Sequence, residues 1–305
     1  LIYFDLNKKL YVSAETDFLK VKYEYMFNNC TNLQSVDLSN LNIENNLSIK
    51  GIFSNCISLI NVNLNNINIT NVIDLSYMFD NCRNISYIDL SSFNNIRKLN
   101  TLEGMFYNCY NLSDLNLSDF DTSKTTNMKL MFYNCSKLSS LNLDNFETSL
   151  VTDMNGLFSN CKSLKSLSLF AFKTSLVIDM SSMFHNCESI QNLTLNNFNT
   201  SSVKRMDNMF KNCYSLISLN ITNFKTKKVE SMASMFENCR NIQFLNLSTF
   251  DTSLVTDMSS MFNGCLFLDY INMSNFTENN LVNYNNIFNN TRANLVYCLH
   301  GKEKS

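Results

Sequence analysis

The sequence predicts a β-rich solenoid of about eleven coils of 26 residues, with short parallel strands and one-turn helices. Ten cysteines from Cys30 to Cys265 recur every 26 residues, with a single interval of 27 before Cys109. Phenylalanine precedes each of them by three residues, and apolar residues follow at three, six and eight residues. A period of this length is the signature of stacked repeats, in which each apolar column faces its own equivalent in the neighbouring coils.

Each unit of the consensus MFxNCxxLxxLxLSxFxTSxVTDMSx contains three elements in order. MFxNC favours a tight turn or a one-turn helix, because asparagine tolerates the left-handed backbone of a corner. LxxLxL reads as a short strand, because its last two apolar positions are two residues apart, as one buried face requires. VTDM is a second extended stretch. Equivalent strands are expected to pair in parallel at about 4.8 Å per coil, with right-handed coiling.

Polar residues mark the point where the turn of each unit begins. Asp153, Asp179 and Asp257, with Asn127 at the equivalent position, are expected to accept hydrogen bonds from the free N–H groups of the turn. The interval of 27 residues places one extra residue in the stretch NNIRKLNTLEG, between the two strands. A loop can bulge outward there without disturbing either ladder.

The columns of cysteine, asparagine and methionine favour structural roles. Cys-x-x-Cys does not occur and only two histidines are present, so neither a metal site nor a cofactor is expected. The cysteines are expected to be buried, reduced thiols. Disulfides between adjacent coils would join the coils in pairs, so the repeat would alternate between two kinds of coil, and no column alternates in this way. The asparagine before each cysteine suits a hydrogen-bonded ladder along the array, and methionine is adaptable core filler.

A file of threonines also repeats with the unit, at Thr122, Thr148, Thr174, Thr200, Thr226 and Thr252. Regular hydroxyl files resemble the ice-binding faces of some solenoids, which need two parallel threonine files on one flat face. Here the second hydroxyl residue is directly adjacent, and strand alternation sends adjacent side chains to opposite faces. Ice binding is therefore disfavoured.

Composition and spacing exclude several classes of function. The chain has 24 lysines and arginines against 26 aspartates and glutamates, so it lacks the basic excess typical of proteins that bind nucleic acid. It contains no run of 18 apolar residues that would predict a transmembrane segment. No unit carries a long loop insertion, and neither His185 nor His300 neighbours a serine or aspartate constellation, so no enzyme activity is expected.

The extended unit MFxNCxxLxxLNLSNFxTSxVTDMSxMF, clearest over 141–161 and 245–265, resembles the BspA-like leucine-rich repeat surface-protein family. The resemblance covers about residues 26–290 and implies a right-handed, leucine-rich-repeat-like array. It also implies surface display in bacteria or unicellular eukaryotes and adhesion to host components or other cells. Two departures are mild: asparagine replaces the usual glycine before cysteine, and the first two units lack the phenylalanine and threonine columns.

The predicted domain organisation has three parts. Residues 1–25 form an N-terminal cap, 26–290 form the solenoid of eleven units, and 291–305 form a C-terminal cap or tail that holds Cys298. Caps are expected because the end coils of a solenoid need a polar outer face. The charged, partly alternating segment 1–25 suits an edge strand or a hairpin. Any signal peptide is expected to have been removed or to lie outside this sequence.

Partner recognition is expected on the face lined by the outward positions of the strands, because these positions vary while the core columns repeat. Most of them are small or amide-bearing, and a few aromatic and acidic residues interrupt this polar field. Exposed aromatic residues are common anchors of recognition, although scattered surface aromatics without a role are the alternative. The predicted partner-binding residues are Tyr87, Asp89, Asp114, Asp144, Phe170, Phe244 and Tyr270.

The predicted function is a non-enzymatic binding or adhesion module that is displayed at the cell surface or secreted. It would recognise a protein or glycan ligand on host or neighbouring cells along the strand-lined face. The alternative is a passive structural stalk or an intracellular scaffold for protein interactions.

Overall fold

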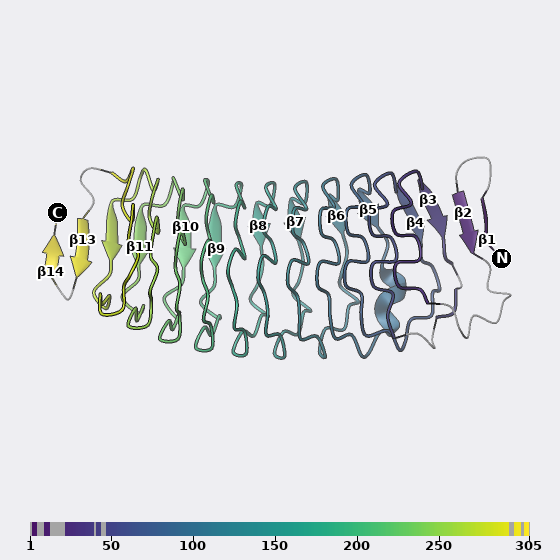
Figure 1. Ribbon diagram of the computed structural model, residues 1–305, viewed down its shortest axis with the longest axis horizontal. Helices are drawn as coiled ribbons and strands as arrows, with labels where there is room; N and C mark the ends of the chain where they lie inside the picture. The colour runs from purple at the N-terminus through teal and green to yellow at the C-terminus, as the bar shows by residue number, and fades with distance from the viewer. Residues whose placement is uncertain are drawn as a thin grey trace.

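The computed structural model describes residues 22–39, 41–43 and 47–292, together with the backbone of two short strands at each end of the chain. The chain winds into an elongated stack of coils, with the N-terminal coils at one end and the C-terminal coils at the other (Figure 1). The predicted solenoid of leucine-rich-repeat-like units of about 26 residues is confirmed.

One short strand in each coil lies in register with its equivalent in a neighbouring coil. Val36 pairs with Val62, and Leu245 pairs with Ile271, in parallel and 26 residues apart. The second residue of each strand faces the core and its neighbours face outward, as the LxxLxL pattern predicts. The strands are β3 (Ser35–Asp37), β4 (Asn61–Asn63), β5 (Tyr87–Ile88), β6 (Asp114–Leu115), β7 (Ser140–Leu141), β8 (Ser166–Leu167), β9 (Asn192–Thr194), β10 (Ser218–Asn220), β11 (Phe244–Asn246) and β12 (Tyr270–Asn272).

The two ends of the parallel ladder are continued by antiparallel hairpins. At the N-terminal end, β1 (Ile2–Phe4) pairs with β2 (Lys9–Val12), which runs parallel to β3. At the C-terminal end, β13 (Val296–Leu299) runs parallel to β12 and pairs with β14 (Lys302–Lys304). The predicted domain boundaries at residues 25 and 290 stay a prediction, since many flanking residues lie outside the described ranges. The same holds for the side chain of Cys298.

The predicted second extended stretch forms a ladder of single-residue parallel bridges. Within the described residues, the ladder runs from Ser48 to Asn283 through nine successive pairings, which correspond to about nine turns of the solenoid. The predicted acceptors lie on this ladder: Asp153 Oδ1 accepts a hydrogen bond from the N–H of Asn155 at 2.8 Å. Equivalent bonds to Asn127, Asp179 and Asp257 are 2.8–2.9 Å long. These acceptors are confirmed.

The MFxNC segments are hydrogen-bonded turns, which is one of the two predicted forms, and not one-turn helices. In the coil of Cys161, its N–H donates to the carbonyl of Phe158 at 3.1 Å, and Asn160 has a left-handed φ of 62°. A left-handed residue ends any helical course at that point. Of the described residues, only those of η1 (Ser91–Asn95), a 3-10 helix, are helical.

The extra residue of the third interval, between Cys82 and Cys109, is accommodated between the two ladders, as predicted. This coil contains η1, whose Phe93 stays buried in the core. Both ladders continue across it, because Ile88 still pairs with Leu115 and the bridge from Asp74 to Thr101 is intact.

The asparagine column forms the predicted ladder at a left-handed corner. Asn186 Nδ2 donates to Asn160 Oδ1 at 2.6 Å, and Asn212 Nδ2 donates to Asn186 Oδ1 at 2.7 Å. All nine predicted asparagines have φ between 56° and 63°. The column is therefore structural. Asparagine adopts the left-handed conformation at a lower steric cost than most residues, and its side-chain amide joins successive coils.

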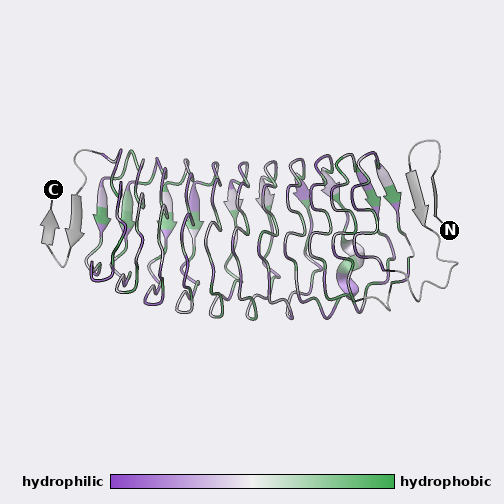
Figure 2. Ribbon diagram, in the orientation of Figure 1, coloured by the Kyte–Doolittle hydropathy of each residue, from purple (hydrophilic) through white to green (hydrophobic). Residues whose placement is uncertain are grey.

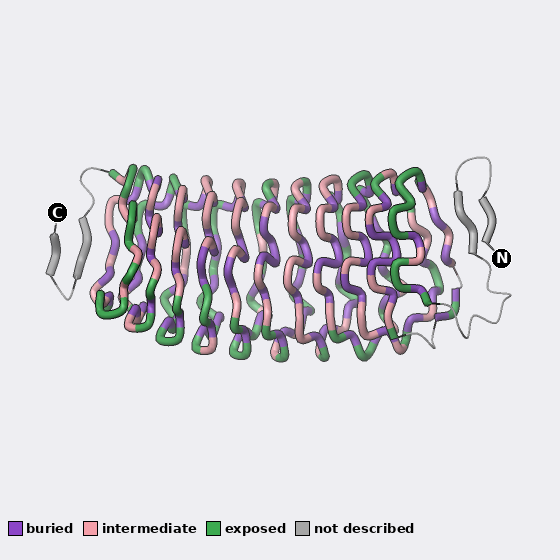
Figure 3. Tube along the Cα trace, in the orientation of Figure 1, coloured by how far each residue is buried: buried purple, intermediate pink, exposed green. Residues whose placement is uncertain are grey.

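Stacked phenylalanines form the core of the array. The rings that precede the cysteines stack from Phe27 to Phe288 with centroids 5.3–5.9 Å apart. The methionine column beside them is fully buried. Buried and exposed segments alternate within every described coil (Figure 3), and individual strands mix hydrophobic with hydrophilic residues (Figure 2). Each coil thus contributes one layer to a continuous core.

The cysteines are free thiols within this core, with one exception to their predicted burial. Nine of the ten described cysteines are buried, and each of these donates to the carbonyl of a phenylalanine in the preceding coil, as Cys161 Sγ does to Phe132 at 3.2 Å. Cys30 is exposed, which corrects the prediction for the first member of the column. It belongs to the first described coil, so no described coil supplies the equivalent carbonyl.

Thiol reactivity is expected to follow this burial. Burial raises the pKa of Cys161 and Cys213 to about 12, above the ordinary value of 9.0. A raised folded-state pKa stabilises the fold fully below about pH 9, and this contribution is lost as the pH rises toward 12. We therefore expect the free energy of unfolding to fall above pH 9. We also expect iodoacetamide at pH 8 to label Cys30 in the native protein, and Cys161 and Cys213 only in urea.

Mass spectrometry of the labelled peptides measures this difference, with Cys30 as the internal control. Rapid native-state labelling of Cys161 would contradict the buried column.

One column alternates in twos, contrary to the prediction that none does. Five residues before the cysteine, the first six coils carry large residues and glycines in turn: Tyr25, Gly51, Tyr77, Gly104, Leu130 and Gly156. All six have positive φ. A Cβ on Gly104 would lie well inside van der Waals contact with the Tyr77 ring. Each large side chain therefore covers the glycine of the next coil.

The threonine file is buried and is not a surface for ice. Thr148 Oγ1 donates to the carbonyl of Lys173 at 2.9 Å and accepts from its N–H at 2.8 Å. The hydroxyls thus bind the backbone of the next coil, and the six threonines are at most 1% exposed.

Candidate functional site

The strand-lined face presents the predicted aromatic residues to solvent. The second residue of each strand points inward, so the residue before it points outward. Tyr87 begins β5 and is 53% exposed, and Phe244 begins β11 and is 65% exposed. Tyr270, at the start of β12, is half-buried. The predicted outward placement is confirmed, while the binding role of these residues stays a prediction.

The seven predicted residues do not converge on one point. Tyr87 pairs with Asp114 across β5 and β6, and Phe244 pairs with Tyr270 across β11 and β12. Phe244 lies six coils beyond Tyr87, which at about 4.8 Å per coil is roughly 30 Å. Between them lie Asp144 and Phe170, both exposed beyond the ends of their strands. The face therefore holds two clusters rather than one site.

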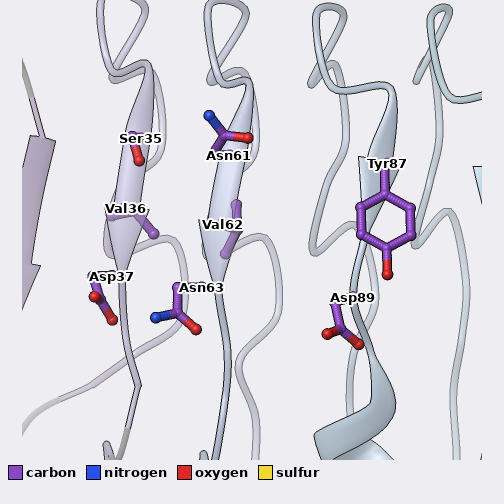
Figure 4. A pocket seen from close by; sticks show the side chains of 8 residues that line it. All are labelled: Ser35, Val36, Asp37, Asn61, Val62, Asn63, Tyr87 and Asp89. Atoms are coloured by element: carbon purple, nitrogen blue, oxygen red, sulfur yellow. The ribbon is translucent and has the colours of Figure 1, made fainter.

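The N-terminal cluster surrounds a shallow hollow of about 310 Å³ over β3, β4 and β5. Asp37, Asn63 and Asp89 form a row across three neighbouring coils, and the Tyr87 ring extends toward Asp89 (Figure 4). Ser35, Val36, Asn61 and Val62 complete the lining. The hollow thus combines two carboxylates, two amides and one aromatic ring.

Local turns hold the two carboxylates in place and ionised. Asp89 Oδ1 accepts from the N–H of Ser91 at 3.0 Å, and hydrogen bonds from Ser91 hold the pKa of Asp89 below its ordinary value. Asp37 Oδ1 accepts from the N–H of Ser39 at 2.9 Å. Burial raises the pKa of Asp37, but hydrogen bonds from Ser39 and Asn63 outweigh this and leave it lowered. Both groups are therefore negatively charged at neutral pH.

The part of this face that is formed by the first five described coils is acidic. Residues 33–39, 59–65, 85–91, 112–118 and 138–144 contain four aspartates and no lysine, arginine or histidine. These four residues, Asp37, Asp89, Asp114 and Asp144, are here called the acidic strip. Sequence reasoning selected the last three and missed Asp37, although it stands in the same column as Asp89, seven residues after the cysteine.

The C-terminal cluster, here called the aromatic patch, consists of Ile217, Phe244, Phe267 and Tyr270. These residues lie on three successive coils, and Ile217 and Phe267 are each 51% exposed. Sequence reasoning missed Ile217 and Phe267, because they stand four and two residues after the cysteine, before the strand whose alternation predicts the outward positions. The nearby Arg240 guanidinium lies 4.5 Å from the Tyr214 ring centroid.

Two further hollows do not bring catalytic groups together. One of about 460 Å³ has Lys225 as the single charged residue of its lining, and one of about 810 Å³ has Glu278. Within residues 22–39, 41–43 and 47–292, no group of three or more His, Cys, Asp or Glu side chains is placed to hold a metal ion. No helix in this part of the chain is long and apolar enough to cross a bilayer.

Three solved structures illustrate what the chain is similar to. A leucine rich cell surface protein from Faecalibacterium prausnitzii is 14% identical, with 93% of this chain and 92% of that chain covered and a TM-score of 0.39. A leucine-rich repeat protein from Eubacterium ventriosum is also 14% identical, with 95% and 92% covered and a TM-score of 0.40. In the Drosophila Toll–Spatzle complex, 82% of this chain aligns at 18% identity and a TM-score of 0.33, and it spans about a third (34%) of that chain.

The sequence profile of one protein family also matches the chain. It is described as "Mycoplasma protein of unknown function, DUF285", and it matches residues 21–142, 136–244 and 215–295. These overlapping matches extend over almost the whole repeat array. A comparison with curated proteins found no match.

Proposed function

This chain belongs to the family described as Mycoplasma protein of unknown function, DUF285, and we propose that it is a non-enzymatic binding and adhesion module. It recognises a protein or glycan ligand along its strand-lined face. The observation that carries the proposal is the exposure of large aromatic residues on that face, since Tyr87 and Phe244 are 53% and 65% exposed. Solenoids generally use such extended faces to bind partners.

A cell-surface or secreted location is part of this proposal. Its support is the resemblance of the repeat unit to the BspA-like surface proteins, whose members act in adhesion. The rival functions are a passive stalk and an intracellular scaffold. A passive stalk needs only the uniform core. If the protein is a stalk, substitution of the exposed aromatic residues will not change its binding to any partner.

The test is a combined substitution of Tyr87→Ser, Phe244→Ser and Tyr270→Ser. A glycan and protein array screen with the intact chain first identifies a ligand, and titration then compares the affinities. Buried aromatic anchors commonly contribute 1–2 kcal/mol or more to binding. We therefore expect the triple variant to bind at least tenfold more weakly, with an unchanged circular dichroism spectrum.

The matched control changes three exposed aliphatic residues near the second ladder, by Leu150→Ser, Leu176→Ser and Ile178→Ser. These side chains are 41–48% exposed and lie outside the strand-lined face. We expect the control to retain full affinity. A triple aromatic variant that binds as tightly as the unmodified chain would remove the site assignment and favour the stalk.

A further inference from the structure

The hollow over β3, β4 and β5 has a chemistry suited to a cation. Its row of Asp37, Asn63 and Asp89 places two carboxylates on either side of an amide, one coil apart from it on each side. Each carboxylate uses Oδ1 to accept a backbone N–H, of Ser39 or Ser91. The exposed Tyr87 ring supplies a π face on the same surface, which attracts a guanidinium or ammonium group.

Charge around the hollow favours the same class of ligand. The acidic strip carries four negative charges over five coils, without a lysine or arginine within residues 33–39, 59–65, 85–91, 112–118 and 138–144. The neighbouring basic positions are Lys137, directly before the last of these segments, and Lys9 of β2, which pairs with Ser35. Arg83 stands outside these segments, one residue after Cys82, and its guanidinium lies 5.6 Å from the Tyr110 ring centroid. A negative surface attracts basic partners and repels nucleic acid and other polyanions.

From these observations we propose that the hollow and the acidic strip bind arginine or lysine side chains of an extended basic segment of a protein partner. This inference rests on the proposed function as a binding module and names the partner class for the N-terminal half of the face. The four aspartates lie on four of five successive coils, so an extended segment that lies along the array meets several of them in turn. A neutral glycan gains nothing from this charge.

The probe is a fluorescein-labelled hexa-arginine peptide, titrated with the full 305-residue chain by fluorescence anisotropy in 50 mM NaCl. We expect saturable binding that weakens steeply in 500 mM NaCl, because exposed charges are screened. Hexa-glutamate and hexa-glycine are expected not to bind. Absence of hexa-arginine binding in 50 mM NaCl, or equally tight binding of hexa-glutamate, would overturn the proposal.

The decisive variant is Asp37→Asn combined with Asp89→Asn. The repeat shows that asparagine is tolerated at this position, since Asn63 and Asn246 accept the same backbone hydrogen bond at 3.1 Å. The double variant is therefore expected to fold normally and to bind hexa-arginine about tenfold more weakly. Tyr87→Leu is expected to weaken binding about threefold.

The matched control is Asp121→Asn combined with Asp251→Asn. It removes the same charge from two aspartates that accept the same kind of backbone hydrogen bond, at 2.9–3.0 Å, outside the strand columns. We expect less than a twofold change in affinity. An equal loss in both double variants would mean that net charge, rather than the hollow, attracts the peptide, and the proposal would fail.

The two proposals fail in distinguishable ways. One outcome is that a ligand from the array screen binds the triple aromatic variant more weakly and binds the Asp37→Asn/Asp89→Asn variant with unchanged affinity. That result would support the binding module and refute the proposal that the face binds a basic segment. If no array ligand is found, the adhesion role fails, while the peptide titration still decides whether the hollow binds cationic side chains.

Discussion

Replacing Phe158 by alanine is expected to lower the free energy of unfolding by about 3–5 kcal/mol. Phe158 is completely buried, and its ring stacks between Phe132 and Phe184 with centroid distances of 5.7 Å on both sides. The substitution removes a large apolar side chain and both stacking contacts, and it leaves a cavity in the middle of the array. Coils above and below cannot close on it, because the two ladders hold them at a constant spacing.

Urea unfolding followed by circular dichroism measures this loss, and Phe170→Ala is the matched control. Phe170 is 70% exposed, so its removal is expected to change the free energy of unfolding by less than about 0.5 kcal/mol. Similar destabilisation by both substitutions would show that the phenylalanine stack does not form the core. A broadened transition in Phe158→Ala would show that the two halves of the array unfold separately.

Replacing Gly104 by alanine is expected to cost about 2–4 kcal/mol, for two additive reasons. Gly104 has a left-handed φ of 56°, which costs a residue with a Cβ roughly 1–2 kcal/mol. The new Cβ would also meet the Tyr77 ring, and overpacking of this kind typically costs about 1–3 kcal/mol. Urea unfolding of the single variant gives the total.

A double-mutant cycle with Tyr77→Ala separates the two causes. The clash disappears in the Tyr77→Ala/Gly104→Ala protein, so Gly104→Ala should cost only about 1–2 kcal/mol in that background. The matched control is Gly264→Asn, at a φ of 74° in the asparagine column. Its Cβ would meet the Oδ1 end of the Asn238 side chain, which can rotate to accept the new amide, so Gly264→Asn should cost less than Gly104→Ala. Fully additive effects would show that the Tyr77 ring does not press on Gly104.

Much of the fold follows from the period of the sequence. The interval of 26 residues determines the coil, and the apolar columns determine which side chains stack, because like residues must superpose when identical units pile up. The acceptors that begin each turn, such as Asp153, are also predictable, since a short polar side chain before a turn has few other partners. The outward placement of Tyr87 and Phe244 follows from strand alternation alone.

Other features depend on how consecutive coils meet. The turn before Cys161 is not helical because Asn160 is left-handed, and in this conformation its Oδ1 accepts a hydrogen bond from Asn186 Nδ2 of the next coil. The alternation of large residues with glycine, as at Tyr77 and Gly104, is present in the sequence. Its physical reason appears only in the structure, where the Tyr77 ring covers Gly104 of the next coil. The exposure of Cys30 likewise depends on its place at the end of the described stack.

By itself, the sequence determined the repeat length, the core columns and the face on which the predicted partner-binding residues stand, because these depend only on local periodicity. Only the tertiary structure decided how those residues are grouped. Stacking separates Tyr87 from Phe244 by six coils and brings Asp37 beside Asn63 and Asp89, because each coil adds a constant rise along one axis. Residues 26 positions apart thereby become neighbours, and a hollow lined by two carboxylates forms from three coils that are each incomplete alone.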